Sequence, residues 1–127
     1  MTKWLALLVL LLVGPAWAGE CRLGGPEMVR AELLFGRDNV PAASWADFLA
    51  KTVTPRFPDG LTVLDGHGQW LSPATGQISR EKSTVLLILA PMAADLRARL
   101  DAVREAYKQR FHQQSVGLVT ATVCADF

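Results

Sequence analysis

The chain has 127 residues, with 13 lysines and arginines against 12 aspartates and glutamates, and a formal net charge of +1. This balance lacks the basic field that binding of nucleic-acid phosphates requires, so we exclude nucleic acid as a partner. The length suits a single domain with a modest core, and no stretch is long enough to act as a linker between two units.

The N-terminal segment resembles a cleavable secretory signal. Lys3 precedes an unbroken apolar run, residues 4–13, and a helix-breaking Gly14-Pro15 leads to an Ala-x-Ala site that ends at Ala18. The run is about half the length of a membrane-spanning helix, so a retained anchor is not expected. We therefore expect a signal peptide at 1–18, a single domain at 19–127, and no membrane association after cleavage. Loss of Lys3 makes the mature chain formally neutral.

The chain has two cysteines, Cys21 and Cys124, one near each end of the mature domain. An even pair in an exported protein predicts a disulfide. The alternative is a reactive thiol or a metal ligand, but neither cysteine has a neighbouring Cys or His at ligand spacing. Lipidation of Cys21 is disfavoured because Glu20, rather than a small residue, precedes it.

The first half of the mature chain predicts a strand, a helix and a second strand. Residues 28–35 alternate between apolar and polar, which is typical of a half-buried strand. Ser44 and Asp47 resemble a capping box that would begin a short helix, and Thr54-Pro55 would end it. Residues 61–71 are predicted to be extended, with the segment 65–68 forming either a bulge or a tight turn.

The second half predicts a turn, a strand, a longer helix and a final strand. Pro73 and Gly76 indicate a hairpin turn over 72–76, and the apolar run within 82–90 indicates the third strand. Apolar residues then repeat at helical spacing over 93–112. Residues 115–124 alternate again and are rich in valine and threonine, which predicts the fourth strand.

The predicted order of elements is β-α-β-β-α-β. This is the order of the ferredoxin-like sandwich, an α+β fold in which an antiparallel four-stranded sheet carries two helices on one face. The first and last strands are antiparallel neighbours in that fold. Cys21 precedes the first strand and Cys124 ends the last, so the fold would bring the two cysteines together.

Three separated motifs carry a family resemblance. They are the run TPRFPDGLTVLD at 54–65, the tripeptide GQW at 68–70 and the run AYKQRF at 106–111. With these motifs the chain resembles a bacterial exported family known as domain of unknown function 3574. The resemblance extends from about Arg30 to Phe127. It implies a bacterial exported protein, periplasmic or secreted, and supplies no activity, cofactor or catalytic residue.

The polar residues that could bind a ligand are few and scattered. Arg56 and Asp59 in the Arg-Phe-Pro-Asp-Gly loop could hold an anion, but we favour a structural role, in which Arg56 pairs with Asp59 or caps the preceding helix. Asp65-x-His67 offers two metal ligands without a third, so we expect no metal site. We expect instead that Asp65 and Gly66 shape a turn and that His67 is solvated. Trp70 either covers the sheet end or serves as an exposed recognition aromatic.

No catalytic constellation is visible. The sequence has no Gly-x-Ser-x-Gly elbow, no Walker or dinucleotide glycine signature and no Cys paired with a His. Ser44 is better explained as a helix cap. We therefore predict no catalytic residue and no cofactor.

The third strand gives the strongest functional hint. Leu86, Ile88 and Ala90 alternate with residues 85, 87 and 89, which are also apolar, yet helices can cover only one face of the sheet. Something should bury the other face, and we expect a homodimer through it, or an unidentified protein or small-molecule partner. The preferred function is thus a non-catalytic binding or self-association module. The alternative is a small enzyme or ligand carrier of the dimeric α+β barrel kind, with Arg56 or His67 as polar contact.

Overall fold

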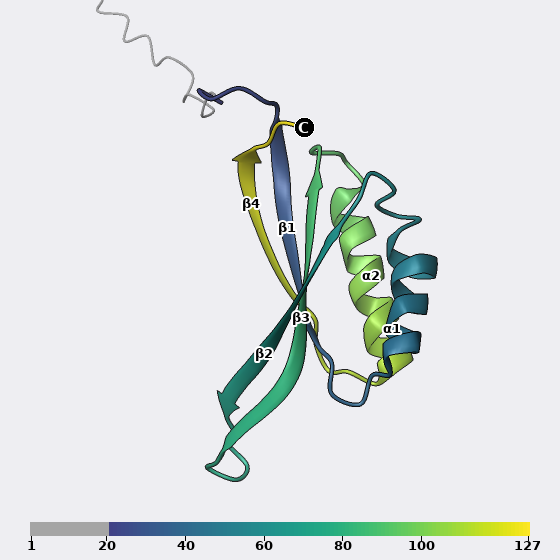
Figure 1. The fold of residues 1–127 in the computed structure, drawn as a ribbon, viewed down its shortest axis with the longest axis vertical. Coiled ribbons are helices and arrows are strands. Elements are labelled where there is room, and N and C mark those ends of the chain that lie inside the picture. The colour runs from purple at the N-terminus through teal and green to yellow at the C-terminus, as the bar shows by residue number, and fades with distance from the viewer. Residues whose placement is uncertain (1–20) are drawn as a thin grey trace, which may run out of the picture.

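The computed structural model describes residues 21–127. The predicted signal peptide and its cleavage site lie outside the described residues. Figure 1 shows the order of the elements along the chain. They are β1 (Glu27–Gly36), α1 (Ala42–Phe48), the π-helical turn η1 (Leu49–Val53), β2 (Thr62–Leu71), β3 (Ile78–Ala90), α2 (Leu96–Phe111) and β4 (Gly117–Cys124). Within residues 21–127, no helix is long and apolar enough to cross a membrane.

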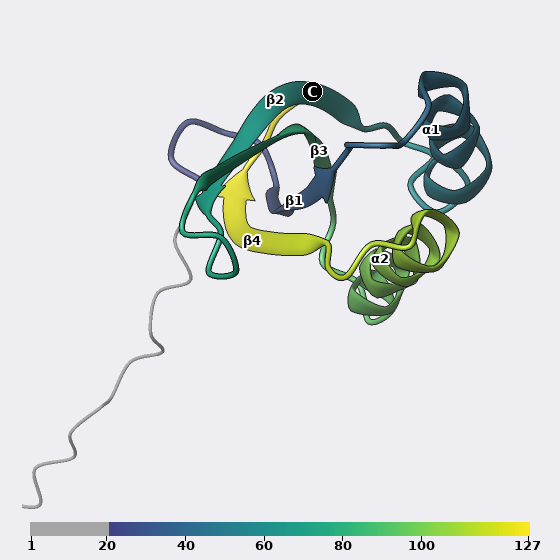
Figure 2. The same cartoon turned by 90° about the horizontal axis from the view of Figure 1, so that it is seen from below.

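The four strands form one antiparallel sheet in the order β2-β3-β1-β4. Both helices pack against the same face of this sheet, and the opposite face carries no helix (Figures 1 and 2). This is the α+β, ferredoxin-like arrangement that the sequence predicted. We call the uncovered side the open face.

The hydrophobic core lies between the sheet and the helices. Alternate residues of β1 and β3 point into it, and Leu33 and Leu86, which are partners across the two strands, are fully buried. One end of the core is aromatic, and its members meet mostly edge to face: Phe35, Trp45, Phe48, Tyr107 and Phe111. Such aromatic pairs stabilise a core beyond the area that they bury.

The disulfide between Cys21 and Cys124 is present, as the fold and the compartment together predicted. The Cα atoms of the two cysteines are 5.5 Å apart. The pairing of Glu27 with Cys124 in the β1–β4 ladder explains the proximity, because it brings the start of β1 beside the end of β4. A disulfide indicates an oxidising compartment.

The predicted capping box at Ser44 and Asp47 is wrong. Helix α1 begins at Ala42 with Pro41 as its N-cap, and no side chain caps it, so Ser44 lies inside the helix. The φ of Pro41 is −60°, and its carbonyl accepts a hydrogen bond from the backbone N–H of Trp45. Proline suits the start of a helix because its fixed φ needs no further ordering, and the helix therefore begins before Ser44.

The bulge or tight turn expected at 65–68 is also wrong. The β2–β3 register is one to one from Thr62, opposite Leu87, to Leu71, opposite Ile78. Both glycines of this segment lie opposite side chains on β3. A Cβ atom on Gly66 would lie 3.3 Å from Ser83 Oγ, a tight contact, whereas one on Gly68 would lie 3.4 Å from Glu81 Cγ, an ordinary van der Waals contact. Close approach of a neighbour therefore accounts for glycine at position 66.

Three further elements begin two to four residues away from their predicted starts, and one turn agrees. β3 begins at Ile78 instead of 82, α2 begins at Leu96 instead of 93, and β4 begins at Gly117 instead of 115. The hairpin turn at 72–76 is present, closed by a hydrogen bond from Ser72 N–H to the Gln77 carbonyl. The early start of β3 makes a long β2–β3 hairpin that extends beyond the ends of the helices (Figure 1).

Candidate functional site

The open face is largely apolar. The edge strands β2 and β4 curve away from the helices, which makes the face concave (Figure 2). Along β3, residues 85, 87 and 89 lie on this face and are half-buried, as the sequence predicted, while Val119 on β4 is 51% exposed. Arg30 and Glu32, two residues apart on the central strand β1, form an ion pair on this face, with 2.5 Å between nitrogen and oxygen. Other apolar members of the face are Met28, Leu34, Leu64, Ala121 and Val123.

A hollow of about 550 Å³ lies on the open face at the end that holds the disulfide. Its walls are apolar apart from Asp59, Gly60 and Thr62. The apolar residues are Met28, Leu61, Leu87, Leu89, Pro91 and Phe127. We call it the disulfide-end hollow.

A second hollow, of about 820 Å³, is bordered by Trp70 and by the segment after α2. Trp70 is 47% exposed and shares this hollow with Glu81 and the stretch 112–115. Trp70 is thus an exposed aromatic at the border of a hollow.

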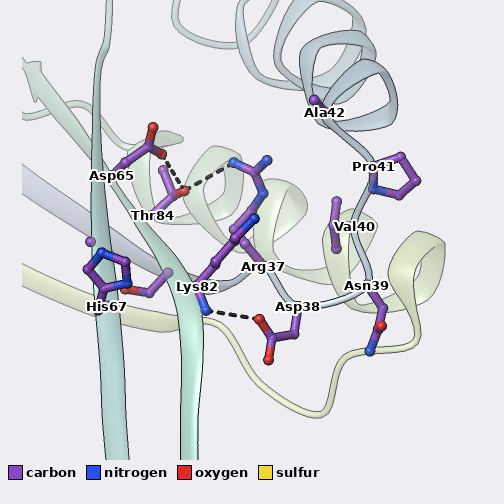
Figure 3. A pocket seen from close by; sticks show the side chains of 12 residues that line it. Arg37, Asp38, Asn39, Val40, Pro41, Ala42, Asp65, His67, Lys82 and Thr84 are labelled. Carbon is purple, nitrogen blue, oxygen red and sulfur yellow. Dashed lines mark hydrogen bonds between the residues drawn. The ribbon is translucent and has the colours of Figure 1, made fainter.

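A third hollow, of about 860 Å³, lies on the other side of the β2–β3 hairpin, between it and the loop that joins β1 to α1 (Figure 3). The residues at 37–42, 65–67 and 82–84 form it, and we call it the polar hollow. The loop is fastened to β3 by hydrogen bonds from Arg37 N–H to the Lys82 carbonyl and from Lys82 N–H to the Asp38 carboxylate. Charged groups of both signs thus meet in one depression.

Three side chains of the polar hollow form a hydrogen-bonded chain (Figure 3). Arg37 Nη1 donates to the Thr84 hydroxyl at 3.1 Å, and that hydroxyl donates to Asp65 Oδ1, also at 3.1 Å. The guanidinium carbon of Arg37 lies 4.4 Å from the centroid of the Trp45 ring. This cation–π contact and the hydrogen bond to Thr84 fix the orientation of the guanidinium group.

The four residues expected to bind a ligand lie in separate places. Arg56 Nη1 donates to the Thr52 carbonyl at the end of η1, and Asp59 borders the disulfide-end hollow. His67 borders the polar hollow, and Trp70 lies beside the second hollow on the open face. The fold therefore brings no two of them into one site.

No metal site emerges from these positions. Asp65 and His67 both border the polar hollow, but the structure described for residues 21–127 contains no group of three or more His, Cys, Asp or Glu that could hold a metal ion.

The perturbed carboxylates lie on helix surfaces away from the hollows. Hydrogen bonds from Lys51 and then Arg110 hold the pKa of Asp47 below its usual value. Hydrogen bonds from Arg97 and then Arg104 do the same for the pKa of Asp101. Both carboxylates are half-exposed at the surface, so these ion pairs contribute little to stability.

Sequence reasoning missed Arg37, Lys82 and Thr84. Thr84 could have been found from the sequence, because it places a polar residue at the next inward-facing position before Leu86, Ile88 and Ala90. Within residues 21–127, Thr84 is the one buried residue that is polar or charged. A polar residue at a core position of a strand needs a partner, and here it has two.

A family model matches residues 30–127. The chain belongs to the family described as Protein of unknown function (DUF3574). No curated protein matches it.

Solved structures are similar to the chain in fold. A phage SAM lyase in complex with S-methyl-5'-thioadenosine aligns with a TM-score of 0.55 at 19% identity, over 82% of this chain and 94% of that one. The GlnK–ATP complex of B. subtilis aligns with a TM-score of 0.50 at 16% identity, over 79% and 84% of the two chains. At these identities the likeness shows the shared fold and nothing of the chemistry.

Proposed function

We propose that this chain is an exported, non-catalytic module that self-associates through the open face of its sheet. The signal-like segment at 1–18 and the disulfide support export of a domain spanning 19–127. The apolar character of the open face is the observation that carries the self-association. Contiguous exposed apolar surface on a small soluble domain costs free energy in water and marks an interaction surface.

The size of the face fits a second copy. Four strands about 4.8 Å apart and about 30 Å long give a projected area of roughly 600 Å². The accessible area of a surface covered by side chains exceeds its projection. The open face therefore approaches the roughly 800 Å² per partner that a standard interface buries.

The charges of the face also fit a second copy. Arg30 and Glu32 lie two residues apart on β1 and pair with each other. A two-fold axis across β1 between them would place each Arg30 opposite the partner subunit's Glu32. A two-fold interface must be self-complementary, and one cation beside one anion satisfies that condition.

Val119→Lys tests the apolar part of the interface. The introduced ammonium group lies opposite Glu32 in the β1–β4 ladder, so the monomer tolerates it, whereas an interface would have to desolvate it. We expect light scattering of the mature protein to give a dimer whose dissociation constant rises by about tenfold or more in the variant. Met92→Lys, at a residue 74% exposed in the β3–α2 loop, is the matched control and should stay dimeric.

A charge exchange tests the two-fold pairing. Arg30→Glu places two carboxylates on each copy and should weaken the dimer, because like charges across an interface are strongly unfavourable. The double variant Arg30→Glu/Glu32→Arg restores one charge of each sign and should recover it. A wild-type protein that stays monomeric at high concentration would refute the proposal.

A small-ligand carrier is the second candidate, and the disulfide-end hollow favours it. Its walls are mostly apolar with a single side-chain carboxylate, that of Asp59, which is a common composition for a small-molecule pocket. The ligands named for the two similar structures, S-methyl-5'-thioadenosine and ATP, both contain adenine attached to a ribose and are the first compounds to try. Binding that Asp59→Asn abolishes in a monomeric protein would favour this function over self-association.

A further inference from the structure

The polar hollow lies where the apolar, helix-facing side of the sheet ends. The side of the sheet that faces the helices is apolar along β3 from Leu86 to Ala90, and it becomes polar at Thr84 and at Asp65, which lies opposite Thr84. Thr84 is buried, and its hydroxyl joins a cation to an anion. Departures from the local pattern of this kind are expected where a protein binds something.

The cation in the hollow is held in place but poorly compensated. Arg37 has five N–H donors, and among residues 21–127 its side chain donates one hydrogen bond, to Thr84. Its Nε is buried without a hydrogen-bond partner, and within residues 21–127 no carboxylate lies within salt-bridge distance of Arg37. A guanidinium group with free donors beside a cavity is suited to a carboxylate of a ligand.

Asp65, the anion in the hollow, likewise has no ion-pair partner among residues 21–127. Asp65 accepts from Thr84 through Oδ1. The hydroxyl of Thr84 stands between Arg37 and Asp65, so the two charges are held near each other without direct contact. One ligand that carries an ammonium group next to a carboxylate could contact both.

The remaining charges argue against a simple anion. Lys82 adds a second cation to the walls of the hollow, and Asp38 adds a second carboxylate, so the walls are formally balanced. A phosphate dianion would gain from the two cations and be repelled by the two carboxylates. A zwitterion can place its carboxylate on the cations and its ammonium group on the carboxylates of the hollow.

We infer that the polar hollow binds a free α-amino acid, with its carboxylate on Arg37 and its ammonium group on Asp65. The rim residues Asp38, Asn39 and His67 favour a polar side chain on that amino acid, and the volume of about 860 Å³ leaves room for a long one. This site is separate from the open face, and the inference does not depend on self-association.

Titration calorimetry of the mature protein against the twenty amino acids tests the inference. We expect at least one polar amino acid to bind at micromolar to millimolar concentration. Acetate, methylammonium and inorganic phosphate should each bind about tenfold more weakly or worse, because each can contact only one of the two charged groups. Binding of acetate or phosphate as tight as that of every amino acid would overturn the zwitterion assignment, and no amino acid binding would overturn the site.

Variants separate binding from a merely structural role of the chain from Arg37 to Asp65. Asp65→Asn keeps the shape of an exposed side chain, and we expect it to weaken binding about tenfold or more while the free energy of unfolding changes little. Arg37→Gln should weaken binding at least as much. Arg80→Gln removes an exposed arginine of the same hairpin that does not border the hollow and should bind as the wild type does. Unchanged binding in Asp65→Asn or Arg37→Gln would show that the hydrogen bonds from Arg37 to Asp65 only hold the β1–α1 loop in place.

Discussion

Replacement of Tyr107 by phenylalanine removes one hydrogen bond from the core and leaves its packing intact. The Tyr107 side chain is fully buried, and its hydroxyl donates to the Gly36 carbonyl at the end of β1. The ring would keep its contacts with Phe35 and Phe111, whose centroids lie 4.6 and 4.8 Å away. The loss is therefore the net value of one hydrogen bond, about 1 to 1.5 kcal/mol of unfolding free energy at neutral pH.

The difference in unfolding free energy between the wild type and Tyr107→Phe should disappear at high pH. Burial raises the pKa of Tyr107 to about 12, against the attraction of Arg37 and with a smaller contribution from Glu81. Because the folded pKa lies above the unfolded value of about 10, the stability that the tyrosine contributes is complete below about pH 10 and falls as the pH rises toward about 12. The fall is about 1.4 kcal/mol per pH unit, so wild type and Tyr107→Phe should be equally stable near about pH 11.

Urea unfolding of both proteins across this pH range is the assay. The chain has one tyrosine, so the ultraviolet absorbance of tyrosinate reports this group directly. All other titrating groups are common to the two proteins and cancel in the difference. A stability difference that stays constant from neutral pH to about pH 11, or a Tyr107 that titrates near about 10 in the folded protein, would refute the reasoning.

Two further predictions concern the end of the sheet that holds the disulfide. The double variant Cys21→Ser/Cys124→Ser should lose about 2 to 5 kcal/mol in denaturant unfolding, because the bond closes a loop with a sequence separation of 103; an unchanged midpoint would contradict this. Gly25→Ala should cost more than Gly76→Ala in thermal unfolding: both glycines have positive φ, of +79° and +66°, but only at Gly25 would the added Cβ meet a backbone atom, the Ala125 carbonyl oxygen at 2.7 Å. Equal losses of thermal stability in the two variants would show that the positive φ alone determines the destabilisation.

The fold could be predicted because its strands and helices carry clear periodicity. β1 alternates throughout, and α2 repeats apolar residues on one face, so both were found with small errors at their ends. The errors fall where local signals compete. The first residues of β3, from Ile78 to Lys82, are mostly polar because the hairpin extends past the helices, and polarity alone resembles a loop. Gly66 and Gly68 resemble a turn until the side chains opposite them are known.

The polar hollow could not be predicted in the same way. Arg37 and Thr84 are separated by 47 residues, and Thr84 and Asp65 by 19, so nothing in local sequence relates them. Their proximity follows from two registers, β1 with β3 and β2 with β3, and a shift of one residue in either would turn the side chains to opposite faces. Arg56, in contrast, stood out in a conspicuous loop, and the structure engages it with the Thr52 carbonyl.

The alternation of β2 also separates the two proposed surfaces. Asp65 and His67 lie on the side of the strand that faces the polar hollow, whereas Leu64 and Trp70 lie on the open face. Asp65→Asn should therefore leave the dimer unchanged. Val119→Lys, on β4, should leave amino acid binding unchanged, because β4 does not border the polar hollow. If either variant altered both properties, the two faces would be coupled through the hairpin that they share.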